Sequence, residues 1–210
     1  MAKAMMTLTA LRFADSADEL SRLDAVAGDG DHGVNMAASF GEAVVRITTD
    51  QPSTAADVFN LVGQAFSEGG GGSAGALFGA YFTKVGQRLG EASNPVSADF
   101  AESLMLGALR VSELGRSALG DKTMIDALQP AAVAAETTAN AGGGIHAVLT
   151  AAAVAARLGA ESTIQMVARS GRARYSNIGA VGTADPGARS VTVLFDSWEE
   201  AMEKELQNEA

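Results

Sequence analysis

The stretch SADFAESLMLGALRVSELG, residues 97–115, carries the pattern that decides the fold. Its apolar residues recur at steps of three and four, which is the spacing of positions on one face of an α-helix. Ser97 stands where a helix N-cap residue is expected, and Gly115 stands where helices commonly end. The stretch therefore predicts one amphipathic helix. Its core-facing positions are Phe100, Leu104, Gly107, Ala108 and Val111.

The rest of the chain repeats this pattern, so an all-α fold is the expected class. Ala is the commonest residue, and the 210 residues include 24 Gly and only 4 Pro. Ala has the highest helix propensity, and its small side chain allows helix axes to approach closely. We find neither a repeat of fixed period nor a low-complexity linker. Residues 1–210 are therefore expected to form a single domain of about eight helices joined by short loops.

Helix boundaries follow from caps and breakers. Two N-cap signatures, Ser16-Ala-Asp-Glu19 and Thr54-Ala-Ala-Asp57, indicate helix starts. Pro130 is expected to start or kink the helix that contains it. The run 190–195 resembles a β-strand, but it fits the beginning of a helix equally well. Further helices are predicted over 5–13, 34–48, 74–90, 123–140, 144–158 and 188–207.

Composition excludes several classes of protein and partner. The chain has no Cys, so it has neither a disulfide framework nor a thiolate zinc site. Fifteen Lys and Arg against 25 Asp and Glu give a net charge of −10, which repels a nucleic-acid backbone. The longest uncharged stretch, 137–156, holds Asn140, three glycines and His146, so no membrane span is expected. We see no secretion signal and expect a soluble cytoplasmic protein.

The segment Leu23–Met36 interleaves three aspartates, Asp24, Asp29 and Asp31, with three glycines. It matches the dinucleotide fingerprint Gly-x-Gly-x-x-Gly. However, helical sequence flanks it on both sides, and two of the aspartates stand where a pyrophosphate would approach. The EF-hand template also fails, because the twelfth position counted from Asp29 is Phe40 and not Glu.

A divalent cation explains this acidic segment best. Two unit charges 4 Å apart repel by about 1 kcal/mol in water and by about 4 kcal/mol at an effective dielectric constant near 20. Oxygen ligands without Cys favour Mg²⁺ over zinc. The glycines allow the backbone to bring the three carboxylates to one centre, and a helix starting near Val34 would direct free N–H groups there. The alternative is a solvated acidic loop that caps a helix.

Other polar links offer further ligand groups. The run Gly69–Gly75 lacks the Lys of a Walker A loop, but its backbone can wrap a phosphate, or it can simply join two helices. The links 120–124, 170–175 and 184–187 are typical of turns or caps. Arg172 and Arg174 stand out in the second link, because cations are scarce in this chain and suit a nucleotide phosphate. His146 lies in an Ala-rich helical pattern and is predicted to be a core or surface residue rather than a ligand.

Together these segments resemble the nucleotide-binding L subunit of dihydroxyacetone kinase. The blocks stand in that family's order and at nearly its spacing: Gly28-Asp-Gly-Asp-His-Gly33 with Asn35-Met36, Gly71-Gly-Ser-Ala-Gly75, Gly120–Leu128, Gly171-Arg-Ala and Asp185-Pro-Gly187. The resemblance implies a barrel of eight antiparallel amphipathic helices with ADP or ATP at one end. It also implies two Mg²⁺ ions that bridge the nucleotide phosphates and are held by Asp24, Asp29 and Asp31. The implied nucleotide-lining residues are His32, Gly33, Val34, Asn35, Ser73, Ala74, Gly115, Met124, Arg172, Asp185, Pro186 and Gly187.

The resemblance further implies a kinase subunit that phosphorylates dihydroxyacetone or a related ketose held by a histidine of a separate K subunit. Two modes stay open: bound ADP is exchanged for ATP, or it is rephosphorylated in place by a phosphocarrier of the phosphoenolpyruvate-dependent phosphotransferase system. Positioning and charge neutralisation suffice for phosphoryl transfer, so no general base is assigned. The alternatives are a nucleotide-sensing adaptor without kinase activity and a helical bundle with an incidental acidic loop. Pairing with a second copy also stays open.

The chain departs from the family's pattern at three places. Ala76 replaces the usual Pro, Thr183-Ala184 precede the Asp-Pro-Gly block, and Arg174 stands where a small residue is more usual. None of these changes removes an implied metal ligand. They leave open which K-like subunit is the partner and which ketose is phosphorylated.

Overall fold

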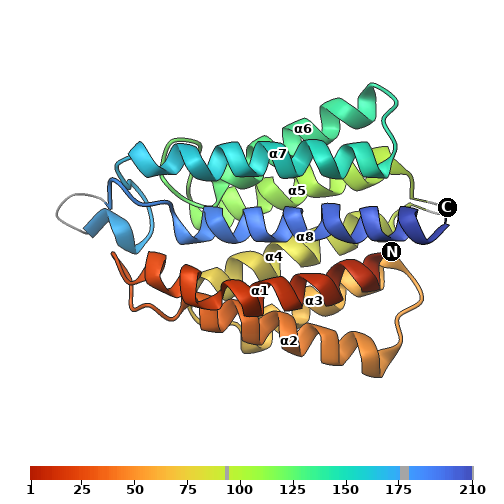
Figure 1. Ribbon diagram of the computed structural model, residues 1–210, viewed down its shortest axis with the longest axis horizontal. Coiled ribbons are helices and arrows are strands. Elements are labelled where there is room, and N and C mark those ends of the chain that lie inside the picture. The colour runs from red at the N-terminus through yellow and green to blue at the C-terminus, as the bar shows by residue number, and fades with distance from the viewer. Residues whose placement is uncertain (93–94, 176–179, 210) are drawn as a thin grey trace.

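The computed structural model describes residues 1–92, 95–175 and 180–209, and every regular element in these ranges is a helix (Figure 1). Two short 3-10 helices, η1 (Thr163–Gln165) and η2 (Arg172–Tyr175), lie in the connection between the last two long helices. The expected all-α class is confirmed. The long helices are α1 (Ala2–Asp24), α2 (His32–Asp50), α3 (Ala55–Gly69), α4 (Gly72–Gly90), α5 (Ser97–Gly115), α6 (Ile125–Asn140), α7 (Ile145–Ser162) and α8 (Pro186–Glu209).

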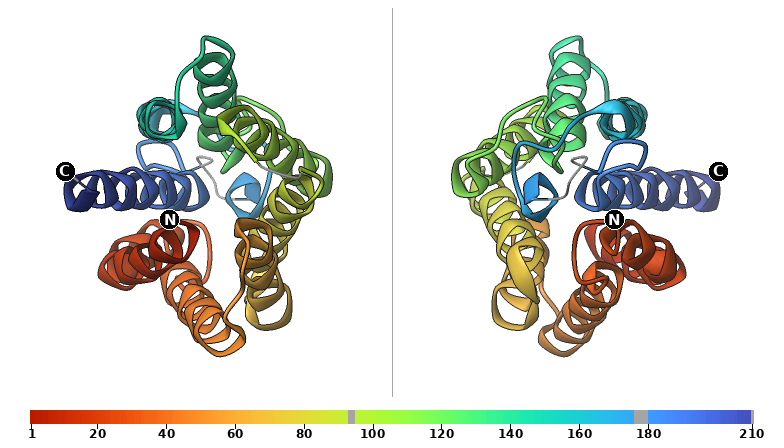
Figure 2. Two further views of the ribbon diagram at one scale, coloured as in Figure 1. Left: turned by 90° about the vertical axis from the view of Figure 1, so that its right-hand side faces the viewer. Right: turned by 90° about the vertical axis from the view of Figure 1, so that its left-hand side faces the viewer.

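Successive helices run in opposite directions, so every second connection lies at the same end of the molecule (Figure 1). Each helix packs against the next one in the chain, and α8 packs against α1, which closes the contacts into a ring. The end-on views of Figure 2 show the helices following one another in this order around the long axis. The connections α1–α2, α3–α4, α5–α6 and α7–α8 share one end. The N-termini of α2, α4, α6 and α8 therefore lie at that end.

Aromatic side chains fill much of the core. Phe40 of α2 stacks on Phe13 of α1 with 4.5 Å between the ring centroids, and Phe66 of α3 meets Phe40 edge-on at 4.8 Å. Trp198 of α8 is fully buried and meets Phe59 edge-on at 5.6 Å. The expected core-facing positions of α5 are all buried, as the apolar spacing in this stretch predicted.

Small residues allow α6 and α7 to approach closely. A Cβ atom on Gly159 of α7 would lie 2.2 Å from the Asp126 carbonyl oxygen of α6, so only glycine fits there. Both helices also bury several alanines, whose small side chains favour short distances between helix axes. The buried alanines of the two helices are Ala127, Ala131, Ala132, Ala135, Ala139, Ala152, Ala153, Ala156 and Ala160.

The capping box predicted at Ser16–Glu19 is wrong, because α1 runs through it without interruption. Phe13 and Leu20 are both buried, so the core-facing side of the helix continues across the polar residues. Packing of this face outweighs the local preference of Ser for a helix end. The predicted helix over 5–13 was therefore too short.

Other boundary predictions have mixed outcomes. Thr54 caps α3 as expected, since its Oγ1 accepts a hydrogen bond from the Asp57 N–H at 3.1 Å. The N-cap of α5 is Val96 rather than Ser97. Pro130 does not start its helix, because α6 begins five residues before it and continues to Asn140. The run 190–195 is helical, as part of α8.

Among the described residues, one stretch, Ile145–Gln165, is long and apolar enough to cross a membrane by length and composition alone. Most of it forms α7, which packs against α6 and α8. Val148 and Leu149 of α7 are fully buried. Part of its apolar surface is therefore buried in the core of this fold.

Candidate functional site

A cavity of about 480 Å³ opens at the end where the connections α1–α2, α3–α4, α5–α6 and α7–α8 meet. All four connections contribute to its walls, because the alternating direction of the helices brings them together. The cavity lies in the size range of sites for small organic ligands and cofactors. Apolar side chains, including Leu77, Leu114 and Met124, form one part of the wall, and Asp24 and Asp31 belong to a polar part.

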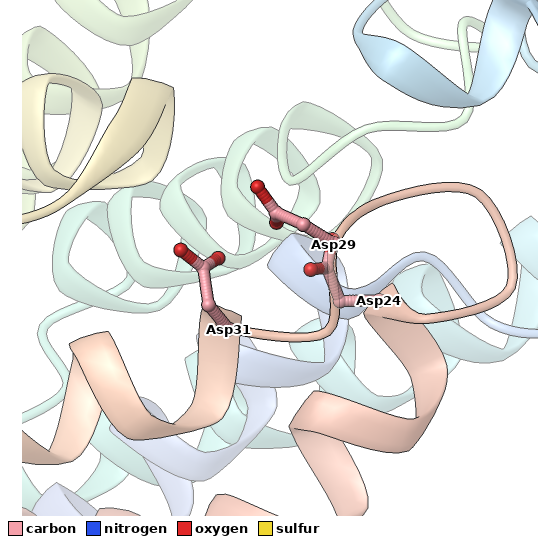
Figure 3. A group of neighbouring side chains, drawn as sticks. All are labelled: Asp24, Asp29 and Asp31. Atoms are coloured by element: carbon pink, nitrogen blue, oxygen red, sulfur yellow. The ribbon is translucent and has the colours of Figure 1, made fainter.

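Three carboxylates converge beside this cavity (Figure 3). Asp24 is the last residue of α1, Asp29 lies in the following loop, and Asp31 directly precedes α2. Each offers a carboxylate oxygen, and these atoms all lie within 4.8 Å of one another. The acidic cluster, Asp24, Asp29 and Asp31, therefore forms in three dimensions as the sequence predicted.

The glycines between these aspartates shape the loop around Asp24. Gly30 has a φ of 76°, which favours glycine, and its N–H donates to Oδ2 of Asp24 at 2.9 Å. A Cβ atom on Gly28 would lie 2.3 Å from the other Asp24 oxygen. A Cβ on Gly33 would lie 1.9 Å from the Ala17 carbonyl oxygen, so this glycine allows α2 to start directly against α1. The glycine pattern thus positions carboxylates rather than a dinucleotide.

Arg172, the first residue of η2, contacts the acidic cluster from a distant part of the chain. Its Nη1 lies 2.5 Å from Oδ2 of Asp29, and both side chains are about half exposed, at 49% and 56%. This hydrogen bond lowers the pKa of Asp29 and raises that of Arg172. Gly72, the first residue of α4, lies beside the guanidinium, since a Cβ there would be 3.5 Å from Nη2. The start of α4, Arg172 and the acidic cluster are therefore neighbours.

The residues present fit a divalent metal ion. The cluster offers only carboxylate oxygens, which are the donors that Mg²⁺ prefers. Asp29 and Asp31 are exposed, so an incoming ion can keep several of its water ligands. Arg172 already balances part of the negative charge, which explains why three carboxylates are tolerated so close together.

Four helix N-termini favour an anion at the same end. The first turns of α2, α4, α6 and α8 have backbone N–H groups without partners inside their helices. The aligned peptide dipoles make these ends partly positive, and each is a suitable place for a phosphate group. An acidic chain thereby gains a local site for an anionic ligand.

The structure brings most of the residues named from the sequence to this one cavity. Gly33 and Val34 are not among its lining residues: Gly33 packs against α1, and Val34 is 62% exposed. Asp29 also lies outside the lining but belongs to the acidic cluster. The residues named from the sequence that do line the cavity are Asp24, Asp31, His32, Asn35, Ser73, Ala74, Gly115, Met124, Arg172, Asp185, Pro186 and Gly187.

The two histidines and Arg174 have different surroundings. His32 is buried, and its Nε2 lies 2.7 Å from the Ser190 hydroxyl, which joins the starts of α2 and α8. Burial lowers the pKa of His32. His146 lies near the start of α7, at the opposite end of the ring. Arg174 packs over the Tyr175 ring, 4.5 Å from its centroid, and does not line the cavity.

Lys122 and Asp126 are polar residues that the sequence interpretation missed. Their exposed fractions are only 2% and 3%. The Asp126 carboxylate accepts hydrogen bonds from the N–H groups of Gly120, at 2.5 Å, and Thr123, at 2.8 Å. The available signal was the pair of charged residues, Asp121 and Lys122, directly after Gly120, but the pattern of this link is equally typical of a turn or a cap.

Asp185 caps α8 and carries an unusual carboxyl group. Its Oδ1 accepts a hydrogen bond from the Ala188 N–H at 2.8 Å. Desolvation raises the pKa of Asp185 to about 7, Asp126 contributes in the same direction, and Lys122 opposes the shift. Because the folded-state pKa lies above its ordinary value, the folded chain holds this proton more tightly than the unfolded chain does. The stability contributed by this group is lost as the pH rises towards 7.

We expect Asp185→Asn to change the pH dependence of stability. Asn keeps an oxygen for the cap but carries no titrating proton. Relative to wild type, the variant should gain about 2–3 kcal/mol in free energy of unfolding between pH 5 and pH 8. Urea denaturation of both nucleotide-free chains at the two pH values measures this difference. An unchanged difference would show that the Asp185 carboxyl titrates normally.

The comparisons with known proteins identify the family. Residues 26–200 match the DAK2 domain, and the chain belongs to this family. It is 31% identical over 183 residues to the "PEP-dependent dihydroxyacetone kinase, ADP-binding subunit DhaL" of Escherichia coli, covering 87% of each chain. It is 38% identical over 186 residues to the "L-erythrulose 1-kinase" of Mycolicibacterium smegmatis, covering 87% of this chain and 32% of that enzyme.

A solved structure agrees with this assignment. The dihydroxyacetone kinase from C. freundii in complex with AMP-PNP and Mg²⁺ matches with a TM-score of 0.74 at 30% identity, over 95% of this chain and 33% of that chain. The chain thus spans about a third of the length of these longer kinases and most of the length of the separate DhaL subunit. The resemblance seen in the sequence is confirmed.

Proposed function

We propose that this chain is the nucleotide-carrying subunit of a two-component ketose kinase, and that phosphate passes from its bound nucleotide to a ketose on a K-like partner. The observation that carries the proposal is the position of the acidic cluster beside a cavity at which four helix N-termini meet. Carboxylates suit a metal ion, and helix N-termini suit phosphates. The DhaL relative is named an ADP-binding subunit, which supports this assignment.

Each part of the cavity has a role in this proposal. Asp24, Asp29 and Asp31 would hold Mg²⁺, with two ions as the family resemblance implies. Bound Mg²⁺ neutralises phosphate charge, which is most of what phosphoryl transfer requires of its surroundings. Arg172 would exchange its contact with Asp29 for a contact with a phosphate. The base and ribose would lie against the apolar wall and the Asp185–Gly187 turn.

The substrate is proposed to be dihydroxyacetone or a related short ketose. Relatives named as dihydroxyacetone kinases and erythrulose kinases support this class of substrate. A K-like subunit would hold the ketose, and the pair would work in the cytoplasm, where ATP is available. The phosphate would reach the nucleotide as ATP or through a phosphotransferase-system phosphocarrier.

We expect Mg²⁺ with ADP to raise the melting temperature of the chain. Ligand at about 100 times its dissociation constant adds about 2.7 kcal/mol to the native state, which corresponds to about 5–10 °C for a domain of this size. ADP with a chelator should produce a much smaller shift, because the phosphates then face the uncompensated acidic cluster. Thermal unfolding with both mixtures, and with Mg²⁺ alone, tests this. Equal shifts with and without metal would remove the role given to the acidic cluster.

Nucleotide retention separates the two modes of phosphate supply. A chain that exchanges ADP for ATP should lose its nucleotide during extensive dialysis. A chain that is rephosphorylated in place should retain ADP. Denaturing the dialysed protein and quantifying the released nucleotide distinguishes the two modes.

A further inference from the structure

Lys122 lines the cavity, but the proposed function gives it no contact with the nucleotide. It belongs to the α5–α6 connection, yet its side chain is only 2% exposed. Its φ of 59° is left-handed, which is uncommon for a residue that is not Gly, Asn or Asp. Burial of an ammonium group is strongly unfavourable unless hydrogen bonds replace its water. A lysine in this position therefore needs partners that hold it.

The partners of Lys122 are two backbone carbonyls of the α7–α8 connection. Its Nζ donates to the Thr163 carbonyl oxygen at 2.5 Å and to the Thr183 carbonyl oxygen at 2.6 Å. Thr163 directly follows α7, and Thr183 stands shortly before α8. One ammonium group therefore ties together the two ends of the long α7–α8 connection.

Neighbouring hydrogen bonds strengthen the junction that Lys122 forms between the α5–α6 and α7–α8 connections. The Arg169 N–H donates to the Asp121 carbonyl oxygen at 3.0 Å, which is a third hydrogen bond between the same two connections. The Asp185 N–H donates to Thr163 Oγ1 at 2.9 Å, and the Gly182 N–H donates to the Ile164 carbonyl oxygen at 2.7 Å. Burial lowers the pKa of Lys122, while the carboxylates of Asp185 and Asp126 favour its charged form.

The segment between these ends carries part of the candidate site. Arg172 lies within it, and the Asp185–Gly187 turn directly follows it. A Cβ atom on Gly187 would lie 3.1 Å from Met124 Cβ, so this turn packs directly on the α5–α6 connection. Arg172 and the Asp185–Gly187 turn are therefore joined along the chain to the ends that Lys122 contacts.

We propose that Lys122 is a positioning residue, whose ammonium fixes both ends of the α7–α8 connection so that Arg172 and the Asp185–Gly187 turn face the nucleotide. This inference rests on the proposed function, since it assigns the connection to nucleotide binding. A compact ammonium group with three N–H donors on a flexible stem can reach two carbonyls in different directions, which the planar guanidinium of Arg cannot do as readily.

The absence of Cys from the sequence permits a test that changes only the ammonium group. Lys122→Cys introduces a single thiol, which is alkylated in denaturant before the chain is refolded. Alkylation with 2-bromoethylamine restores a side chain of lysine length with its ammonium. Alkylation with 1-bromopropane gives a side chain of the same length without charge or donors. Wild-type chain carried through the same steps is the control.

Two readouts are compared: hydrogen exchange at the amides of Gly182 and Asp185 in the nucleotide-free chain, and the Kd for ADP with Mg²⁺. The aminoethyl form should match wild type in both. The propyl form should exchange faster at these amides, with unchanged exchange in α3, and should bind Mg-ADP about ten-fold or more weakly. If the propyl form does not refold, Lys122→Gln replaces it and should show the same two changes.

A propyl or Gln form with wild-type Mg-ADP affinity would overturn the proposal, even if exchange is faster. An aminoethyl form that is no better than the propyl form would overturn it as well. Failure of the proposed function would give a different result from failure of this inference. Wild type itself would then bind no Mg-ADP, while hydrogen exchange at Gly182 and Asp185 would still show whether Lys122 holds the two connections together.

Discussion

Asp29→Asn is expected to lower the rate of phosphoryl transfer by at least about two orders of magnitude in the presence of the proposed K-like partner. The substitution keeps size and one oxygen but removes a unit of charge and an anionic ligand that Mg²⁺ prefers. Each 1.4 kcal/mol of lost transition-state stabilisation is about a ten-fold loss of rate, and a metal ion supplies several kcal/mol. The measurement is the rate of ketose phosphate formation, together with the Mg-ADP affinity.

The fold of this variant should survive. The spacing of the aspartates suggests that removing one charge relieves repulsion, but Arg172 already pairs with Asp29. This ion pair is half exposed, and such pairs contribute about 0–1 kcal/mol. The free energy of unfolding of the nucleotide-free chain is therefore expected to change by less than about 1 kcal/mol.

Asp50→Asn is the matched control for this experiment. Asp50 is the last residue of α2, at the opposite end of the ring from the acidic cluster, and it is exposed. The same chemical change there should leave Mg-ADP affinity and transfer at wild-type levels. Wild-type Mg-ADP affinity in Asp29→Asn would require the metal assignment to be abandoned.

The isolated chain is expected to phosphorylate no ketose, whereas addition of a K-like subunit should start turnover. Under the proposed function a histidine of the K-like subunit would hold the ketose, and this chain has two histidines of its own. His32 is buried against Ser190, and His146 lies at the end opposite the cavity, so neither is available to anchor a ketose beside the nucleotide. Product formation from ATP with dihydroxyacetone or erythrulose, with and without the partner, measures this. Steady turnover by the purified chain alone would contradict it.

The existence of the helices could be predicted from the sequence, but their ends only in part. The apolar spacing in residues 97–115 identifies α5 because burial of one face is a property of the segment itself. Ser16 and Glu19 form a capping signature, yet α1 continues through them because Phe13 and Leu20 are both buried in the core. Local signals give way to tertiary packing where the two disagree.

The residues of the candidate site could also be predicted only where they lie close together in the sequence. Asp24, Asp29 and Asp31 could be grouped from the sequence because they lie in one short segment. The contact of Arg172 with Asp29 joins segments far apart in the chain. Lys122 could not be predicted as a junction, because its partners are backbone carbonyls 41 and 61 residues away, and a carbonyl has no side-chain signature.

The central claim, a metal-dependent nucleotide site at the shared end of the ring, is tested most directly by calorimetric titration of ADP into the wild-type chain, with Mg²⁺ and with a chelator. Nucleotide must first be removed from the protein by denaturation and refolding, so that retained ADP does not block the site. We predict a single ADP bound per chain with Mg²⁺ and an affinity weaker by at least about ten-fold with the chelator. No binding with Mg²⁺, or equal affinity in both titrations, would contradict the account.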